Sequence, residues 1–208
     1  AIRPTDTEMV IVVEGCAPVY LPLTPASASP QKVALDRGVT VRGRLLDRAG
    51  QPVSPGCVAV GTFPTDWMVV KTNAAGYFVL EHVPPGPTVL LAHGEGHVDT
   101  EVDVIAGAST SDLTITLERG TRVTGAVVEH LRGSTVENPR VRFFRAGDAA
   151  ATPIEEVEVG AIGTFALDLL PGSYRVVATQ ADREAETTLE VGTAPSPALE
   201  LTLRTRAK

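Results

Sequence analysis

Apolar and polar residues alternate along residues 72–92, and this alternation organises the interpretation of the whole chain. Phe78 and Leu80 are separated by one residue, which is the period of a strand with one buried face. Residues 73–76 before this strand predict a tight turn, because glycine tolerates positive φ and asparagine does so at little cost. The Pro-Pro-Gly sequence at 84–86 ends the strand and turns the chain into the next one.

The same order of turn, strand, turn and strand returns at residues 160–178. The segments that open each copy also match, because residues 35–43 and 117–125 both carry leucine, an acidic residue, arginine and glycine in the same order. The distance between the copies is roughly 80 to 90 residues, a period that indicates repeated modules. We therefore predict two complete modules, residues 37–118 and residues 119–208.

Each module is expected to contain about seven short strands, the number and spacing of a β-sandwich. The strands of the first module are expected at residues 39–45, 57–60, 67–71, 78–81, 89–92, 97–105 and 113–117. No segment predicts a helix. Residues 183–189 contain helix-forming residue types, but their counterpart in the first copy is a strand, so we expect a strand there as well. The predicted fold class is all-β, a tandem of seven-stranded sandwiches.

Residues 1–36 resemble the end of a further copy whose first half is absent. Residues 9–13 match one strand of the module, residues 19–23 match the next, and residues 32–35 match its last strand. Strands without partners leave unpaired backbone groups and an exposed apolar face. We expect this piece to be completed by an upstream module, by a second chain or by the first full module, and we favour an upstream module.

Composition narrows the class of protein. The apolar fraction is 43% but aromatic residues make up only 4%, so the cores must be built mainly from aliphatic residues. The formal charge of −7 argues against a nucleic-acid surface, which carries clustered Lys and Arg. No apolar run approaches the roughly 18 residues of a membrane-spanning helix. Cys16 and Cys57 fall in different copies, and we favour two small buried side chains over a disulfide between them.

At its turns the chain resembles the carboxypeptidase regulatory-like domain, a transthyretin-like seven-stranded β-sandwich. Residues 43–53 match its opening turn motif, residues 72–78 match its Thr-Asn-x-x-Gly-x-Phe motif, and residues 171–174 match its Pro-Gly-x-Tyr motif. Two places depart from the pattern, since Thr88 replaces the tyrosine in the first module and residues 128–133 alter the opening turn of the second. The resemblance implies a transthyretin-like or Ig-like fold and a secreted or surface-exposed bacterial module.

Aromatic residues offer one candidate binding site. Trp67, with Phe63 and Tyr77 near it in the sequence, could form a platform for a sugar ring. The alternative is that Trp67 packs in the core or at a module interface, as a tryptophan usually does. These three residues are the ligand-binding candidates.

Other polar residues point to no cofactor. His93, Glu95 and His97 have a spacing that could hold zinc on a straight strand, but the glycines between them predict a hairpin tip instead. Acidic residues alternate at 99, 101 and 103, forming an acidic stripe. Calcium needs ligands from several directions, which one strand face does not supply, so we interpret these residues as a solvated strand face. No serine lies in a nucleophile elbow, and the histidines pair with no Cys or Ser in a known motif.

These observations predict a protein without catalytic activity and without a cofactor. Its expected role is a structural or adhesive spacer or display module of a bacterial secreted or cell-envelope protein, located outside the cell, at its surface or in the periplasm. Its expected partners are other protein modules or subunits, and polysaccharide is an additional candidate. The alternative is a carbohydrate- or protein-binding accessory module of a secreted hydrolase.

Overall fold

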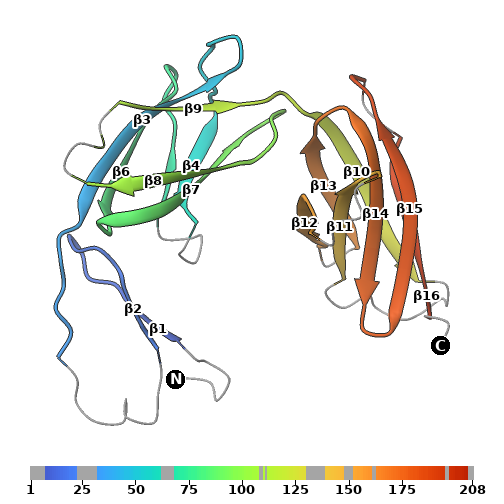
Figure 1. Ribbon diagram of the computed structural model, residues 1–208, viewed down its shortest axis with the longest axis horizontal. Coiled ribbons are helices and arrows are strands. Elements are labelled where there is room, and N and C mark those ends of the chain that lie inside the picture. The colour runs from blue at the N-terminus through green and yellow to red at the C-terminus, as the bar shows by residue number, and fades with distance from the viewer. Residues whose placement is uncertain are drawn as a thin grey trace. The chain divides into compact units, whose positions relative to one another are not determined.

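The computed structural model describes residues 8–22, 32–61, 68–107, 110, 112–129, 139–147, 152–160, 163–194 and 197–205. These residues form strands and connecting loops with no helix, so the all-β prediction is confirmed (Figure 1). The chain divides into two compact units. Unit 1 contains Ala1–Glu95 and Asp99–Leu117, and unit 2 contains Gly96–Val98 and Glu118–Lys208. The described part of the chain holds no helix that is long and apolar enough to cross a membrane.

Unit 1 is built from two sheets that face each other across one core. The three-stranded sheet has the order β6-β3-β9, and the four-stranded sheet has the order β5-β4-β7-β8. The bounds of these strands are β3 Val39–Asp47, β4 Gly56–Val60, β5 Val69–Lys71, β6 Tyr77–Val83, β7 Gly86–Gly94, β8 Thr100–Ala106 and β9 Leu113–Leu117. Each lies where the alternation of residues predicts a strand.

Unit 2 repeats this arrangement strand for strand. Its bounds are β10 Thr121–Glu129, β11 Arg140–Arg145, β12 Glu155–Glu158, β13 Thr164–Leu169, β14 Gly172–Gln180, β15 Arg183–Val191 and β16 Leu199–Thr205. Strands β13, β10 and β16 lie side by side in the order of β6, β3 and β9, and β12, β11, β14 and β15 follow the order of β5, β4, β7 and β8. Residues 183–189 are a strand, as predicted.

The two units differ in whether their last two strands pair with each other. In unit 2 the end of β15 pairs with the end of β16, with Arg183 opposite Thr205 and Glu184 opposite Arg204. This pairing joins all the strands into one seven-stranded sheet. In unit 1 the corresponding strands β8 and β9 form no ladder, so the described strands of its two sheets remain separate.

In each sandwich the first and last strands, β3 and β9 in unit 1 and β10 and β16 in unit 2, lie next to each other and run parallel. Strand β3 pairs with β9 from Gly43 opposite Leu113 to Asp47 opposite Leu117. Strand β10 pairs with β16 in the same way, from Gly125 opposite Leu199 to Glu129 opposite Leu203. The two ends of a unit are therefore held together directly by backbone hydrogen bonds.

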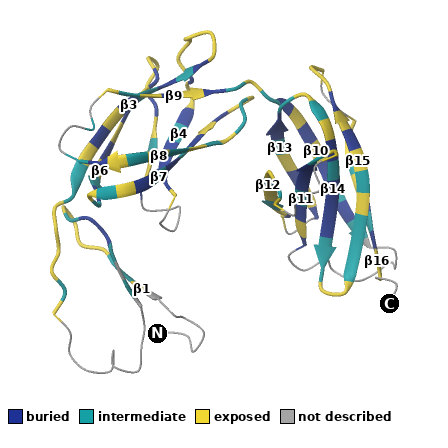
Figure 2. Cartoon of the chain, in the orientation of Figure 1, coloured by how far each residue is buried: buried dark blue, intermediate teal, exposed yellow. Residues whose placement is uncertain are grey.

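Buried residues, dark blue in Figure 2, lie along the strands of both units. In each core a glycine of one strand lies against a phenylalanine ring of the next. Gly43 lies opposite Phe78 in the β3–β6 ladder, and a side chain at Gly43 would overlap the Phe78 ring and the carbonyl of Leu113. Gly125 lies opposite Phe165 in the same relation. The tip of each aromatic ring thus packs against the backbone of the opening strand at a distance that leaves no room for a side chain.

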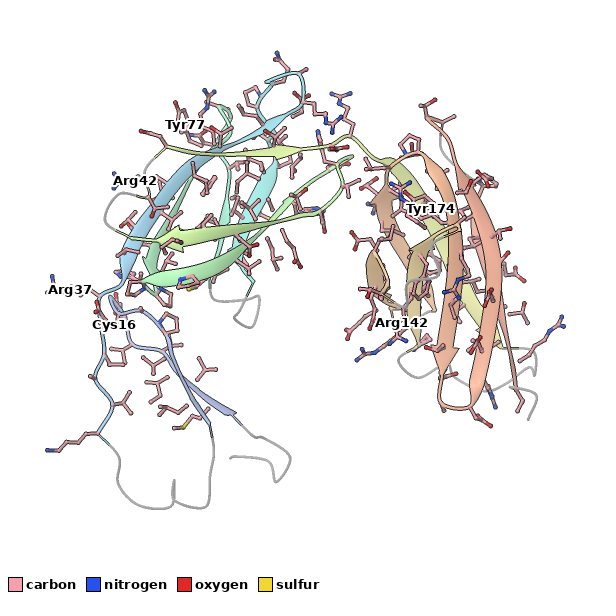
Figure 3. All side chains as sticks on the ribbon, viewed as in Figure 1. Cys16, Arg37, Arg42, Tyr77, Arg142 and Tyr174 are labelled. Carbon is pink, nitrogen blue, oxygen red and sulfur yellow. The ribbon has the colours of Figure 1, made fainter. Side chains whose placement is uncertain are left out.

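The N-terminal segment forms a hairpin of β1 Glu8–Ile11 and β2 Val19–Pro22. Among the described strands these two pair only with each other. The amide of Ala17 donates to the carbonyl of Asp36 at 2.7 Å, so the hairpin loop contacts the segment that leads into β3 (Figure 3). A hydrogen bond of the same kind joins Val98 to Glu118 at 2.9 Å within unit 2.

The expected strand at residues 32–35 is wrong, because these residues adopt no regular structure. Their counterpart β9 is held in a sheet by its parallel partner β3. Among the described residues nothing equivalent to β3 precedes residue 32, so this segment has no strand to pair with. The sequence predicts a small net insertion in the second copy, at residues 134–136 or 148–152, and all of these residues except 152 lie outside the described ones.

Candidate functional site

The turn before β6 holds Tyr77 in a defined position. Gly76 has a φ of 76° and donates to the carbonyl of Asn73 at 2.8 Å. The Asn73 side-chain oxygen accepts hydrogen bonds from the amides of Ala75 and Tyr77, each at 3.0 Å. The carbonyl of Gly76 in turn accepts from the amide of Leu45 in β3 at 2.8 Å. The predicted turn is confirmed, and it ties the start of β6 to the neighbouring strand.

Arg44 covers one face of the Tyr77 ring. Its guanidinium carbon lies 4.7 Å from the ring centroid, within the range of a cation–π contact. A terminal nitrogen of Arg44 also donates to the carbonyl of Ala75 at 3.3 Å. Tyr77 remains 50% exposed. The tyrosine ring and the guanidinium are therefore held in place before any partner arrives.

Arg42 and Val79 extend this surface along the same face of the sheet. In the β3–β6 ladder Arg42 is opposite Val79 and Arg44 is opposite Tyr77. The pair between them points to the core, so these two pairs lie on the same outer face. Both Arg42 and Val79 are exposed, and Figure 3 shows Arg42 and Tyr77 on the outside of unit 1. We call these four residues the Arg44–Tyr77 surface. It offers an aromatic face, an aliphatic side chain and two positive charges in a chain of net charge −7.

Unit 2 has the same scaffold without this surface. Gly163 has a φ of 80°, and its carbonyl accepts from Val127 at 2.8 Å, as Gly76 accepts from Leu45. The residues that correspond to Arg44 and Tyr77 are Ala126 and Thr164, which face each other in the β10–β13 ladder. The Arg44–Tyr77 surface is thus a feature of unit 1 and not a requirement of the fold.

The other two aromatic candidates, Phe63 and Trp67, lie outside the described residues. Of the three predicted ligand-binding residues, only Tyr77 has a described position. Tyr77 was predicted because it lies near Trp67 in the sequence. Arg44 was missed, because only the β3–β6 register places it beside Tyr77. The signal available in the sequence was the alternation of Arg42 and Arg44 with the core residues of the opening strand.

His93 and His97 do not converge. The Nδ1 atom of His93 lies 2.6 Å from an oxygen of Asp99, whereas His97 forms an isolated bridge with Arg119. In the described ranges no group of three or more His, Cys, Asp or Glu residues could hold a metal ion. The acidic stripe lies on β8, where Glu101 and Asp103 are exposed while Val102 and Val104 pack against the core, as the alternation predicts.

Cys57 lies next to His93 in the sheet, a placement that no sequence motif indicated. Cys57 is opposite His93 in the β4–β7 ladder and opposite Lys71 in the β4–β5 ladder. Both Cys57 and Cys16 are free thiols. They are half-buried, so neither the disulfide nor the fully buried environment considered for them is present.

Glu156 on β12 joins two arginines of the neighbouring strand β11. Its carboxylate accepts hydrogen bonds from Arg140 at 2.6 Å and from Arg142 at 2.7 Å. These bonds, first that of Arg142 and then that of Arg140, lower the pKa of Glu156 below its ordinary value. Glu156 therefore forms ion pairs that link β11 to β12.

Replacing Glu156 with glutamine should reduce the acid sensitivity of unit 2. Because the folded-state pKa of Glu156 is lowered, its contribution is present above the unfolded pKa and is lost as the pH falls through the folded value. The difference in urea midpoint between pH 7 and pH 3 should therefore be smaller in the variant than in the wild type. Equal differences in both proteins would show that the two arginine contacts contribute nothing to folding.

Taken together, the described sites belong to an all-β, β-sandwich protein with exposed surface sites. No protein-family model matches the sequence, and no curated protein sequence matches it significantly. The carboxypeptidase regulatory-like family therefore stays a resemblance.

Three solved structures match the chain at low sequence identity. The Bacillus anthracis TIE protein is 14% identical with a TM-score of 0.33, and the match covers 81% of this chain and 34% of that protein. A Streptococcal ancillary pilin is 12% identical with a TM-score of 0.31, covering 94% and 73% of the two chains. A mutant of the shaft pilin SpaA from Lactobacillus rhamnosus GG is 10% identical with a TM-score of 0.37, covering 82% and 99%. All three TM-scores lie below 0.5.

Proposed function

We propose that this chain is a load-bearing structural module of a bacterial secreted or cell-envelope protein, without catalytic activity. The observation that carries the proposal is the parallel pairing of the first and last strands in each unit. Its support from the sequence is the resemblance to modules that are displayed outside the cytoplasm. Residues 1–36 are then the end of a further module of the same kind, since Ala17 of their hairpin loop donates to Asp36, just before β3, as Val98 donates to Glu118, just before β10.

Parallel terminal strands resist a pull on the two ends of a unit. The N-terminal end of β3 and the C-terminal end of β9 lie at opposite ends of their shared ladder, from Gly43 opposite Leu113 to Asp47 opposite Leu117. A force applied there acts along the strands and loads the hydrogen bonds of the whole ladder together. If the same strands were pulled apart from one end, the bonds would break one after another at lower force.

Single-molecule pulling tests this role. In a variant with both cysteines replaced by serine, handles are attached through Arg37→Cys and Thr116→Cys, which load the β3–β9 ladder in shear. The matched control uses Ala49→Cys and Thr116→Cys, which load the same ladder from its Asp47–Leu117 end. We expect a clearly higher rupture force in shear, with roughly 25 nm released per unit at about 3.3–3.6 Å per residue. Equal forces in the two geometries would reject a load-bearing role.

A second candidate function, binding of a protein or polysaccharide partner, is favoured by the Arg44–Tyr77 surface. Its ring and guanidinium are already ordered, which lowers the entropic cost of binding. The test is calorimetric titration of the chain with polysaccharide from the source organism's envelope. If this function holds, Tyr77→Ala and Arg44→Ala weaken binding about tenfold or more, which corresponds to ~1.4 kcal/mol. Thr164→Ala, at the equivalent position of unit 2, should leave binding unchanged.

The wild-type titration separates the two functions. Absence of heat with the wild type, together with a high shear force, supports a structural module without this ligand. Binding that Tyr77→Ala leaves intact would place the contact elsewhere on the chain.

A further inference from the structure

Four polar residues form a row across the outer face of the four-stranded sheet of unit 1. Cys57 on β4 has Lys71 of β5 on one side and His93 of β7 on the other. Directly opposite residues in antiparallel strands have their Cβ atoms about 4.5–5.5 Å apart. Asp99, just before β8, reaches His93 from the far side. We call Lys71, Cys57, His93 and Asp99 the thiol row.

The row presents the thiol to solvent. His93 and Lys71 are exposed and Cys57 is half-buried, while the residues on either side of Cys57, Gly56 and Val58, are buried. The pairing of strands, and not their order in the sequence, brings the row together. This explains why no motif in the sequence revealed it.

Asp99 sets the state of the histidine. A carboxylate can only accept, so the Nδ1–H of His93 donates to Asp99 at 2.6 Å. The neutral imidazole then carries its lone pair on Nε2, the nitrogen that is free to act as a base. A thiol on β4, a base on β7 and a carboxylate just before β8 that orients the base thus lie side by side.

The thiol depends on such a base at neutral pH. Partial burial raises the pKa of Cys57, the charge of Asp99 adds to this, and the charge of Lys71 opposes it. The other charged groups on this face of β8 are Glu101 and Asp103, which lie opposite Leu91 and Val89 in the β7–β8 ladder. Little thiolate is therefore present before a partner arrives, and a proton must leave as the new bond forms.

The surrounding backbone limits which chemistry the row can support. Strands β4 and β7 are inner strands of the sheet, so their amide groups point in its plane toward neighbouring strands. Acyl transfer needs donors aimed at a developing oxyanion, and none projects from the face of these strands. Exchange with a disulfide needs no oxyanion site, because a thiolate attacks sulfur and a thiolate leaves.

We propose that Cys57 is a thiol–disulfide exchange site, with His93 as its general base and Asp99 as the residue that positions His93. The Nε2 atom of His93 takes the thiol proton as the Cys57 sulfur attacks one sulfur of a partner disulfide. A new S–S bond forms, the partner's S–S bond breaks, and the departing thiolate receives the proton from the imidazolium. Cys57 is oxidised and the departing sulfur is reduced, so no further oxidant is needed. The partner is a molecule that carries an accessible disulfide.

The proposal is tested by the reaction rate of Cys57 with dithiodipyridine, a neutral disulfide whose leaving group absorbs light. Cys16→Ser leaves Cys57 as the sole thiol, and His93→Gln is compared with the wild-type histidine in that background. General bases typically contribute 10²–10⁴-fold in enzymes, and on this open face we expect His93→Gln to slow the reaction about tenfold or more at pH 7. Asp99→Asn should slow it by a smaller factor.

The pH profile separates a base from a merely structural residue. With His93 present, the rate should fall as the imidazole becomes protonated, whereas the His93→Gln rate should follow the titration of the thiol alone. Cys16, measured in a Cys57→Ser background, is the control, and its rate should be the same with and without His93. Equal Cys57 rates and profiles for histidine and glutamine would overturn the proposal. That result would leave the load-bearing role untouched, because the two rest on different strands.

Discussion

Replacing Phe78 with alanine should destabilise unit 1 by about 3–5 kcal/mol, the cost of removing a fully buried phenylalanine. Phe78 is 2% exposed. Its ring lies on Gly43, and nothing else on β3 can fill that space because position 43 has no side chain. The cavity would therefore remain open between β6 and β3, next to the parallel β3–β9 ladder. We expect the loss of stability to appear first in that ladder.

Hydrogen exchange measured strand by strand is the suitable readout, because it reports each unit separately. Amides of β3 and β9 should lose protection in Phe78→Ala, and amides of β10 and β16 should lose it in Phe165→Ala. Tyr77→Ala is the matched control, since it removes a larger ring from the neighbouring, half-exposed position. If Phe78→Ala cost no more than Tyr77→Ala, the packing of Phe78 on Gly43 would not be a main source of stability.

The second large effect is expected at Tyr174, with about 3 kcal/mol or more lost on substitution by alanine. Tyr174 is 1% exposed, its hydroxyl donates to the carbonyl of Leu170 at 2.6 Å, and the guanidinium of Arg145 lies 5.0 Å from its ring. The hydroxyl therefore closes the turn that leads from β13 into β14. Burial also raises the pKa of Tyr174, so the hydroxyl keeps its proton at neutral pH and can donate.

A pair of variants separates the ring from its hydroxyl. Tyr174→Phe keeps the ring but leaves the Leu170 carbonyl without its donor, which should cost about 1–3 kcal/mol. Urea denaturation followed by amide exchange in β14 and β15 measures both variants. Thr88→Ala in unit 1 is the control, since Thr88 occupies the equivalent place with a 3.3 Å bond to Gly86 and a much smaller side chain. A Tyr174→Ala cost as small as that of Thr88→Ala would contradict the assigned role.

The alternation of residues was sufficient to predict the strands. Phe78 and Leu80 point into the core while Tyr77 and Val79 point out, as their period requires. The glycines of the turns were equally informative, since Gly50 and Gly76 both adopt positive φ where a tight turn was expected. The segment at 32–35 failed because an alternating pattern makes a strand only where a partner supplies the hydrogen bonds.

The surface sites could not be predicted in the same way. Arg44 meets Tyr77, and Cys57 meets His93, only through the registers of the β3–β6 and β4–β7 ladders. A shift of one residue in either ladder would turn one partner of each pair to the opposite face. Register depends on packing and turn geometry across the whole unit, and no local pattern in the sequence encodes it directly.

The pairing of β15 with β16 gives the two units different numbers of exposed strand edges. Unit 2 is one continuous sheet that ends at β12 and β13, whereas unit 1 leaves edges at β5, β6, β8 and β9. Strand β8 carries Glu101 and Asp103 on its outer face, charges that oppose pairing with another chain, but Ile105 beside them is 78% exposed. At high protein concentration, self-association is therefore expected to occur mainly through the strand edges of unit 1. The negative charges of Glu101 and Asp103 on β8 oppose it.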